Sequence, residues 1–237
     1  MTAPAWPGFV GIDLGGEAVP DATTLLKFRR LLEQHQLGER LFAEVGRVLQ
    51  ASGMKLASGT IVDATLSAAP SSTKNKQQAR DPEMHQTRQG KQWYFGLHIG
   101  VDSQSGLAHS AVVTSANVHD KHPLPKWLHG HEQRVDGDSA YASQKALIRD
   151  KAPQARDCTN QRTRCAGEVD EVARGKNRNE SKIRARVEHV LAVVKRVWGF
   201  TKVRYRGLAK NANRAFVALA LTNVYLSRRR LMAQVRP

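Results

Sequence analysis

The sequence predicts an α/β domain in which a mixed sheet is flanked by helices. Segments with apolar residues at helical spacing alternate along the chain with short, dense apolar runs that are typical of strands. Two of these runs are separated by a short turn, so the sheet contains an antiparallel hairpin. The 237 residues are enough for one large domain or two small ones.

Two helices are expected before the first strand. After a loop-like start over residues 1–20, Asp21 or Thr23 can cap a helix. Its apolar face consists of Leu25, Phe28, Leu31 and Leu32. A second helix is expected over about 37–51, where apolar residues recur at helical spacing.

The apolar period then changes to that of strands. Strands are expected at 60–66, 92–101, 107–114 and 133–138, and residues 102–106 form the hairpin turn. The polar, basic segment 69–88 is expected to be a loop. Around 120–128 we expect a short helix that two prolines interrupt.

Three further helices are expected in the C-terminal part. They span 143–150, 181–198 and 212–232, with Ser143 as the cap of the first and Gly199 as the end of the second. Residues 151–180 are polar and weakly patterned, which predicts a long connection.

The net charge of +16 and the isoelectric point near 10.4 indicate an anionic partner. Nucleic acid is the first candidate and an anionic membrane surface the second. No acidic residue follows Glu188, whereas 11 lysines and arginines do, interleaved with apolar residues. This pattern favours a phosphate-binding surface on a packed scaffold over a solvated basic tail.

Cysteine content and apolar runs exclude two protein classes. Cys158 and Cys165 cannot build a disulfide framework, which indicates a reducing, intracellular protein. Their spacing matches no common zinc pattern, so unpaired thiols are favoured over a zinc site with His189. No signal peptide is recognisable, and the longest apolar run, 215–226, is too short to span a bilayer.

Three acidic residues stand out by position. Asp63 lies in an apolar strand, Asp138 ends a strand and Glu188 lies on a helix. If the carboxylates met at about 4 Å, each pair would repel by about 4 kcal/mol at an effective dielectric near 20. Such a cluster needs cations, unless one carboxylate is protonated. Oxygen ligands suit Mg²⁺ or Mn²⁺, and two such ions can assist phosphodiester cleavage.

Plainer interpretations stay open at this point. Asp63 could lie on a solvated strand face, Asp136 competes with Asp138, and Glu188 could pair with Arg184 four residues earlier on the helix.

Other polar segments carry weaker signals. His119 and His122, beside Asp120, are interpreted as loop residues rather than metal ligands. The segment 71–76, with Lys74 and Lys76, lacks the glycines of a phosphate-binding loop. It either contacts DNA backbone or is a mobile loop.

Several stretches together resemble bacterial insertion-sequence transposases with a DDE active site, of the family usually called IS-five. The resemblance extends from about residue 20 to 230. The matching stretches are Gly59–Thr65, Ala69–Asn75, Arg80–His85, Trp93–Gly96, His98–Asp102, Ala116–Asp120, Gly137–Tyr141, Arg186–His189 and Arg204–Leu208. It implies an RNase H-like fold and a catalytic, metal-binding triad. The triad consists of Asp63, Asp138 and Glu188.

The family patterns also imply further roles. Asp-x-Gly/Ala-Tyr at the second acid selects Asp138 over Asp136. Related families carry a Tyr-x2-Arg-x3-Glu-x6-Lys signature, in which Arg184 and Lys195 would contact DNA phosphates, although Ser181 replaces the tyrosine. With Lys74, Lys76, Arg204 and Arg206 they complete the expected DNA-binding residues.

The resemblance implies DNA cleavage at the ends of an element and strand transfer into target DNA, with two Mg²⁺ or Mn²⁺ ions. It further implies a homo-oligomer on DNA and a cytoplasmic, nucleoid-associated location. A helical segment, 1–55, would precede an RNase H-like catalytic domain, 56–237, with basic C-terminal helices.

Two departures from the family pattern suggest a truncated or decayed copy. A helical region usually precedes residue 1, and the strand around 96–98 looks about two residues short. One alternative is therefore a catalytically impaired DNA-binding relic or inhibitor of transposition. Another is an RNase H-like nuclease without strand transfer.

Overall fold

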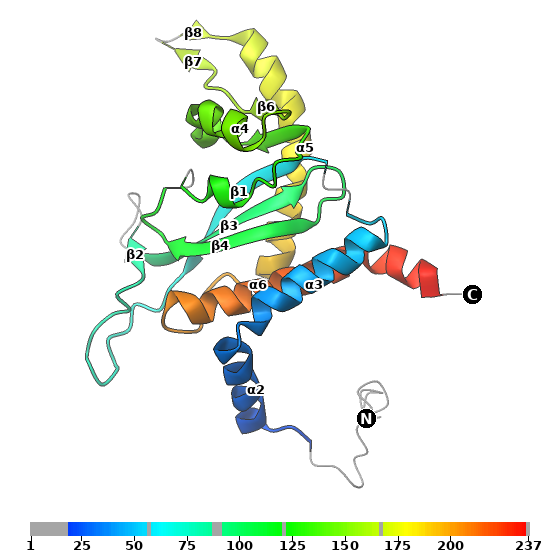
Figure 1. The fold of residues 1–237 in the computed structure, drawn as a ribbon. Helices are drawn as coiled ribbons and strands as arrows, with labels where there is room; N and C mark the ends of the chain where they lie inside the picture. The colour runs from blue at the N-terminus through cyan, green and yellow to red at the C-terminus, as the bar shows by residue number, and fades with distance from the viewer. Residues whose placement is uncertain (1–18, 56–57, 87–91, 120–121, 166–167, 236–237) are drawn as a thin grey trace, which may run out of the picture.

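The computed structural model describes residues 19–55, 58–86, 92–119, 122–165 and 168–235. A mixed sheet lies at the centre, and helices cover it (Figure 1), which confirms the predicted fold class. The sheet strands are β1 (Thr60–Ala68), β2 (His85–Gln86), β3 (Trp93–Asp102), β4 (Ala108–Ser115), β5 (Arg134–Gly137) and β6 (Arg156–Thr159). A separate small hairpin consists of β7 (Arg164–Cys165) and β8 (Glu168–Val169).

The α-helices are α2 (Ala22–Gln34), α3 (Leu37–Ala51), α4 (Lys145–Lys151), α5 (Glu171–Arg196) and α6 (Leu208–Val235). Two short 3₁₀ segments, η1 (Leu124–Lys126) and η2 (Ser139–Gln144), follow β4 and β5. The expected loop at 1–20 and the expected helix start at 120–121 lie largely outside the described residues.

The two N-terminal helices form where the sequence predicts them. Asp21 caps α2 by accepting a hydrogen bond from the backbone N–H of Thr24 at 2.6 Å. Helix α3 lies beside α6, with Phe42 and Phe216 in ring contact at 5.9 Å. At Gly38, an added Cβ would lie 2.3 Å from the Asn213 side chain, so only glycine permits this close approach.

The sheet order is β2–β3–β1–β5–β6, and β4 also pairs with β3. Strands β3 and β4 form the predicted antiparallel hairpin, whereas β1, β5 and β6 run parallel. The pairing of β1 with β3 is uninterrupted from Thr60–Asp102 to Ala68–Tyr94. The segment that looks short in the sequence therefore still pairs along the whole of β1.

Two hydrophobic clusters cover the two faces of the sheet. On one face, odd-numbered β3 residues such as Leu97 and Ile99 pack with Val190 of α5 and Leu219 of α6. On the other face, Val62 and Val135 pack with Trp127, Tyr141 and Ile148, which follow β4 and β5 in the chain. Alternate residues of β1 therefore point into different clusters, as strand geometry requires.

Helix α5 begins ten residues before its predicted start. Asp170 caps it by accepting a hydrogen bond from the N–H of Ala173 at 2.9 Å. The first turns are mostly exposed and extend beyond the sheet (Figure 1), so they carry no apolar period to detect. The helix ends before Gly199, whose φ of +63° suits glycine, as predicted.

Two other predictions about the region between β5 and α5 are wrong. The expected connection at 151–180 contains β6, the small hairpin and the start of α5. Ser143 does not cap α4, because that helix begins at Lys145 after the 3₁₀ segment η2 and has Gln144 at its N-cap position. Among the described residues, no helix combines the length and apolar character needed to cross a bilayer.

Candidate active site

The parallel pairing of β1 and β5 places two acidic residues side by side. Ile61 pairs with Asp136 in this register. Asp63 and Asp138 each lie two residues further along, and residues two apart in a strand point to the same face. That face is the one on which α5 packs.

Arg184 of α5 lies between the two carboxylates. One guanidinium nitrogen, Nη2, is 3.9 Å from Asp63 Oδ2, and the other, Nη1, is 3.8 Å from Asp138 Oδ1. The Arg184 and Asp63 side chains are only 15% and 21% exposed, whereas Asp138 is 54% exposed. Both contacts are longer than a hydrogen bond, so the arginine balances charge without saturating the carboxylate oxygens.

Glu188 follows Arg184 by one helical turn and joins the same electrostatic group. Burial raises the pKa of Asp63, and the negative charges of Asp138 and Glu188 raise it further. A hydrogen bond of 2.8 Å from the N–H of Ala64 and the charge of Arg184 act in the opposite direction on this pKa. The structure thus brings Asp63 and Asp138 to one arginine and leaves Glu188 close enough for its charge to act on Asp63.

The remaining predicted DNA-binding residues lie outside this group. Lys195 is half-buried, two turns beyond Glu188 on α5. Lys74 and Lys76 are exposed in the loop after β1, and Arg204 and Arg206 are exposed just before α6. These four exposed cations therefore come from two segments that are far apart in the sequence.

A second acidic group lies nearby and was not recognised in the sequence. Asp136, Cys158 and Glu180 offer ligand atoms within 4.8 Å of one another. Arg134 already occupies this position: its Nε and Nη2 donate to Asp136 at 2.8 and 2.6 Å, and Nη2 also donates to Glu180 at 2.5 Å. The sequence signal for this group was the pair of opposite charges at Arg134 and Asp136, which lie two residues apart in one strand.

The two groups differ in how their charge is balanced. Asp136 is fully buried; burial raises its pKa and Arg134 lowers it. The bidentate guanidinium satisfies both carboxylate oxygens, as arginine geometry favours. Burial also raises the pKa of the Cys158 thiol to about 11. Asp136 thus belongs to an internal ion-pair network, and Asp138 is the acid that faces Asp63.

The carboxylates around Arg184 fit a divalent cation. Asp63, Asp138 and Glu188 offer only oxygen ligands, as Mg²⁺ and Mn²⁺ prefer. Asp63 and Asp138 together place two negative charges beside the single positive charge of Arg184, and the charge of Glu188 acts on Asp63 as well. The site therefore has the ligand type and the excess charge that a cation would neutralise.

The other candidate ligands do not form such a site in the described part of the chain. Cys158 is buried beside Asp136, whereas His189 is exposed on α5. His119 and His122 lie in the connection after β4, where the N–H of His122 donates to the carbonyl of His119. This agrees with their interpretation as loop residues.

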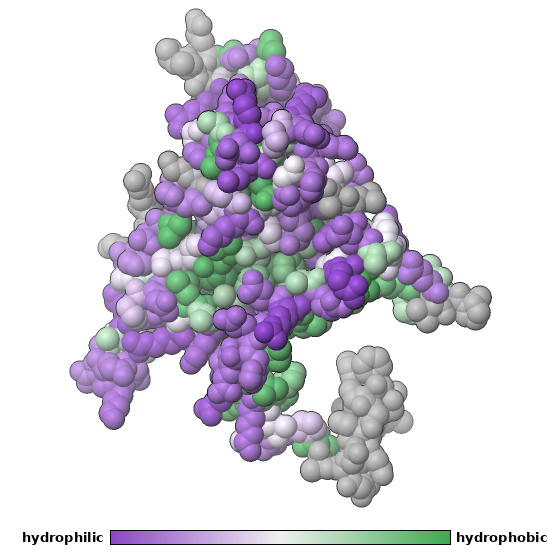
Figure 2. All heavy atoms as spheres, in the orientation of Figure 1, coloured by the Kyte–Doolittle hydropathy of each residue, from purple (hydrophilic) through white to green (hydrophobic). Residues whose placement is uncertain are grey.

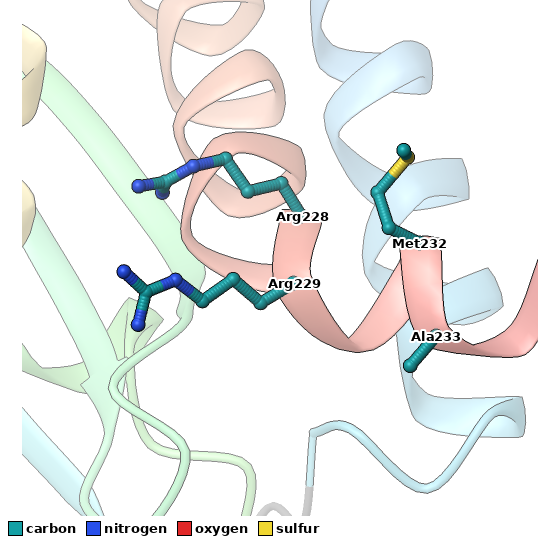
Figure 3. Close-up of a pocket in the computed structure, with 4 residues that line it drawn as sticks. All are labelled: Arg228, Arg229, Met232 and Ala233. Carbon is teal, nitrogen blue, oxygen red and sulfur yellow. The ribbon is translucent and has the colours of Figure 1, made fainter.

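A shallow hollow of about 630 Å³ lies on the last turns of α6. Its described lining residues are Arg228, Arg229, Met232 and Ala233, and Figure 3 shows the two arginine side chains extending to the same side of the helix. None of these four residues is acidic or nucleophilic. The hollow therefore adds positive charge to the C-terminal region but has no group for bond-breaking chemistry.

A family model described as the transposase DDE domain matches residues 55–224. The chain belongs to this family. The matched range begins just before β1 and ends within α6, so this transposase domain contains all three acids of the site. The family indicates DNA as the partner and a nuclease or transferase activity that depends on a divalent metal. No solved structure matches the chain.

Proposed function

We propose that this chain is the DDE transposase of an insertion sequence of the IS-five family. It would cut DNA strands at the ends of its element and join them to target DNA. The observation that carries this proposal is that Arg184 joins Asp63 and Asp138, with the charge of Glu188 acting on Asp63, in a chain of the transposase family.

Asp63, Asp138 and Glu188 would hold two Mg²⁺ or Mn²⁺ ions. Such an ion pair, when bound, activates a water or a 3′-hydroxyl as nucleophile and stabilises the leaving oxygen of a phosphodiester. The protein's contribution is to place these carboxylates on two neighbouring parallel strands and one helix, because phosphoryl transfer is promoted chiefly by positioning and electrostatics.

Arg184 is suited to contact a DNA phosphate beside these carboxylates. Its side chain is 15% exposed, and its two Nη atoms stay beyond hydrogen-bond distance of the acids. A guanidinium with free donors binds phosphate oxygens well. Lys195 would add a second phosphate contact along α5.

The wider surface would bind the DNA duplex as a homo-oligomer. Lys74, Lys76, Arg204 and Arg206 are exposed and can neutralise phosphates. We further propose that residues 56–237 form the catalytic domain, that residues 1–55 form a helical segment before it, and that the protein acts in the cytoplasm at the nucleoid.

The test is cleavage of a labelled duplex that carries the ends of the parent element. We expect Mg²⁺-dependent cuts at the ends, followed by joined products, and we expect Asp138→Asn to abolish both. Removing an interaction of several kcal/mol corresponds to a loss of about 1000-fold or more in rate. Asp150→Asn, which removes an exposed acid with 70% side-chain exposure, is the matched control and should retain activity.

The other outcomes contradict the proposal in recognisable ways. DNA binding without cleavage by the unaltered chain would favour an impaired copy that acts as an inhibitor or is a relic. Cleavage without joined products would favour a nuclease that lacks strand transfer.

A further inference from the structure

Two segments that are distant in the sequence meet beyond the end of β1. One is the loop 69–84, which leads out of β1, and the other is the segment 201–208, which leads into α6. The backbone of Ala68 bonds with both Thr201 and Val203, so the second segment lies beside the end of the strand. Figure 1 shows both segments on the same side of the molecule.

Two carboxylates of the loop bind the backbone at the start of α6. Asp81 Oδ2 accepts a hydrogen bond from the N–H of Gly207 at 2.6 Å, and Glu83 Oε2 accepts one from Leu208 at 2.8 Å. These N–H groups have no partner within the helix, and the helix dipole favours negative charge there. Arg206 adds a bond of 3.2 Å to the carbonyl of Arg80.

Further contacts hold the loop at its C-terminal end and at its tip. Met84 is 1% exposed within the main hydrophobic cluster, and Ser115 donates to the carbonyl of Glu83 at 2.8 Å. At the tip, the Asn75 side chain bonds to the backbone of Gln77 and Ala79. Nearby, Arg80 lies over the Trp93 ring at 5.0 Å.

The charges left for solvent on these two segments are positive. Asp81 and Glu83 are the only acids in residues 69–84 and 201–208, and both are bound to backbone N–H groups. Figure 2 shows the loop as a hydrophilic projection. The exposed cations, here called the loop–α6 surface, are Lys74, Lys76, Arg80, Lys202, Arg204 and Arg206.

The loop–α6 surface lies along β1 from the candidate active site. Ala68 follows Asp63 by five residues, which is about 17 Å in a strand. Since base pairs of B-DNA rise 3.4 Å each, this distance corresponds to about five base pairs. A duplex with its cleaved phosphate near Asp63 would therefore reach these cations within about half a helical turn.

We propose that Asp81 and Glu83 are positioning residues that assemble the loop–α6 surface into a single site for the DNA backbone, displaced from the cleavage site. The inference rests on the proposed function, because it takes DNA as the partner. It goes further because it assigns Arg80 and Lys202 to DNA binding. It also gives Asp81 and Glu83 a role that strengthens binding of the DNA backbone, although both are negatively charged.

The test compares two ways of removing two negative charges. Asp81→Asn with Glu83→Gln is measured against Asp150→Asn with Glu171→Gln, two exposed acids elsewhere. Affinity for a fluorescent duplex of random sequence is measured by anisotropy over a range of salt concentrations. If the acids were only surface charges, both double variants would bind DNA as well as or better than the unaltered chain.

We expect the Asp81/Glu83 variant to bind about tenfold more weakly near 0.2 M salt, with a salt slope reduced by about two, as for the loss of two phosphate contacts. The control should lose no affinity. Equal behaviour of the two double variants would overturn the inference. Failure of the unaltered chain to bind the duplex would instead contradict the proposed function.

A second variant guards against misfolding. Lys74→Gln with Lys76→Gln changes only exposed side chains and should reduce the salt slope by about two by itself. Combined with the Asp81/Glu83 variant, the lysine changes should have little further effect, because the loop is no longer held in place. If the losses of affinity in the Asp81/Glu83 variant and the Lys74/Lys76 variant simply added, the acids would not position the lysines.

Discussion

Two acidic groups each include one glutamate of α5, and these glutamates lie about two turns apart. In one group an arginine forms direct hydrogen bonds with the carboxylates, and in the other it stays beyond hydrogen-bond distance. Glu180 meets Asp136 through the bidentate Arg134, at distances of 2.5–2.8 Å. Glu188 lies near Asp63, where Arg184 approaches no closer than 3.8 Å. A cluster of acids therefore does not by itself indicate a metal site. The position of the nearest guanidinium decides whether the carboxylates are already satisfied.

The largest effect that tests this contrast should come from Arg134. In Arg134→Gln, the fully buried Asp136 loses its cation, which we expect to lower the free energy of unfolding by about 3 kcal/mol. Urea denaturation measures this change. Arg174→Gln breaks an exposed pair with Glu171 and should cost no more than about 0.5 kcal/mol. Similar small losses in both variants would contradict a structural Arg134 network.

A slightly smaller effect should follow from adding Mg²⁺ to the unaltered protein. At about 100 times its dissociation constant, an ion that binds only the folded chain raises the free energy of unfolding by about 2.7 kcal/mol. We expect Asp63→Asn to remove this stabilisation and Asp150→Asn to retain it, as measured by denaturation at increasing Mg²⁺. Undiminished stabilisation in Asp63→Asn would place the ion elsewhere.

The smallest effect concerns pH in the absence of metal. Because the pKa of Asp63 in the folded chain is raised above its ordinary value of 3.8, the folded state binds the proton more tightly. Its stabilising contribution is complete below pH 3.8 and is lost as the pH rises through the raised pKa. Asp63→Asn should therefore gain stability relative to the unaltered chain as the pH rises.

Denaturation at several pH values, with a chelator present, measures this difference between the two proteins. Asp136 shifts in the same direction, so the comparison with Asp63→Asn is needed to isolate the Asp63 carboxyl. A difference in stability that is constant with pH would contradict the assigned shift.

Sequence patterns predicted those elements that pack against the core. Helix α3 has the predicted bounds because its buried residues recur at helical spacing. The hairpin of β3 and β4 lies within a residue of its expected limits because β3 is a dense apolar run that is buried along most of its length. The first ten residues of α5 extend beyond the sheet and bury almost nothing, so composition alone suggested a connection. A segment that packs against no core can form a helix without the apolar spacing by which helices are recognised in a sequence.

Only part of the candidate site could be predicted from the sequence. Asp63, Asp138 and Glu188 stood out by position and by resemblance to a known family; in the structure Asp63 and Asp138 share Arg184, and the charge of Glu188 acts on Asp63. Their catalytic role stays a prediction. The bond between Arg134 and Glu180 joins residues 46 apart in the sequence, and no local pattern signals such pairs. The hydrogen bond from Leu208 to Glu83 likewise joins residues that are far apart in the sequence.

The continuity of α5 also bears on how insertions in this family should be judged. The helix carries Glu180, Arg184 and Glu188 without a break, so each residue inserted between the first two would turn the others by about 100°. A copy with one extra residue there would retain every acidic and basic residue of the helix, yet Glu180 and Glu188 could no longer reach Arg134 and Asp63 at the same time. Among members of this family, unchanged spacing along this helix is therefore a better sign of an intact arrangement than unchanged residues alone.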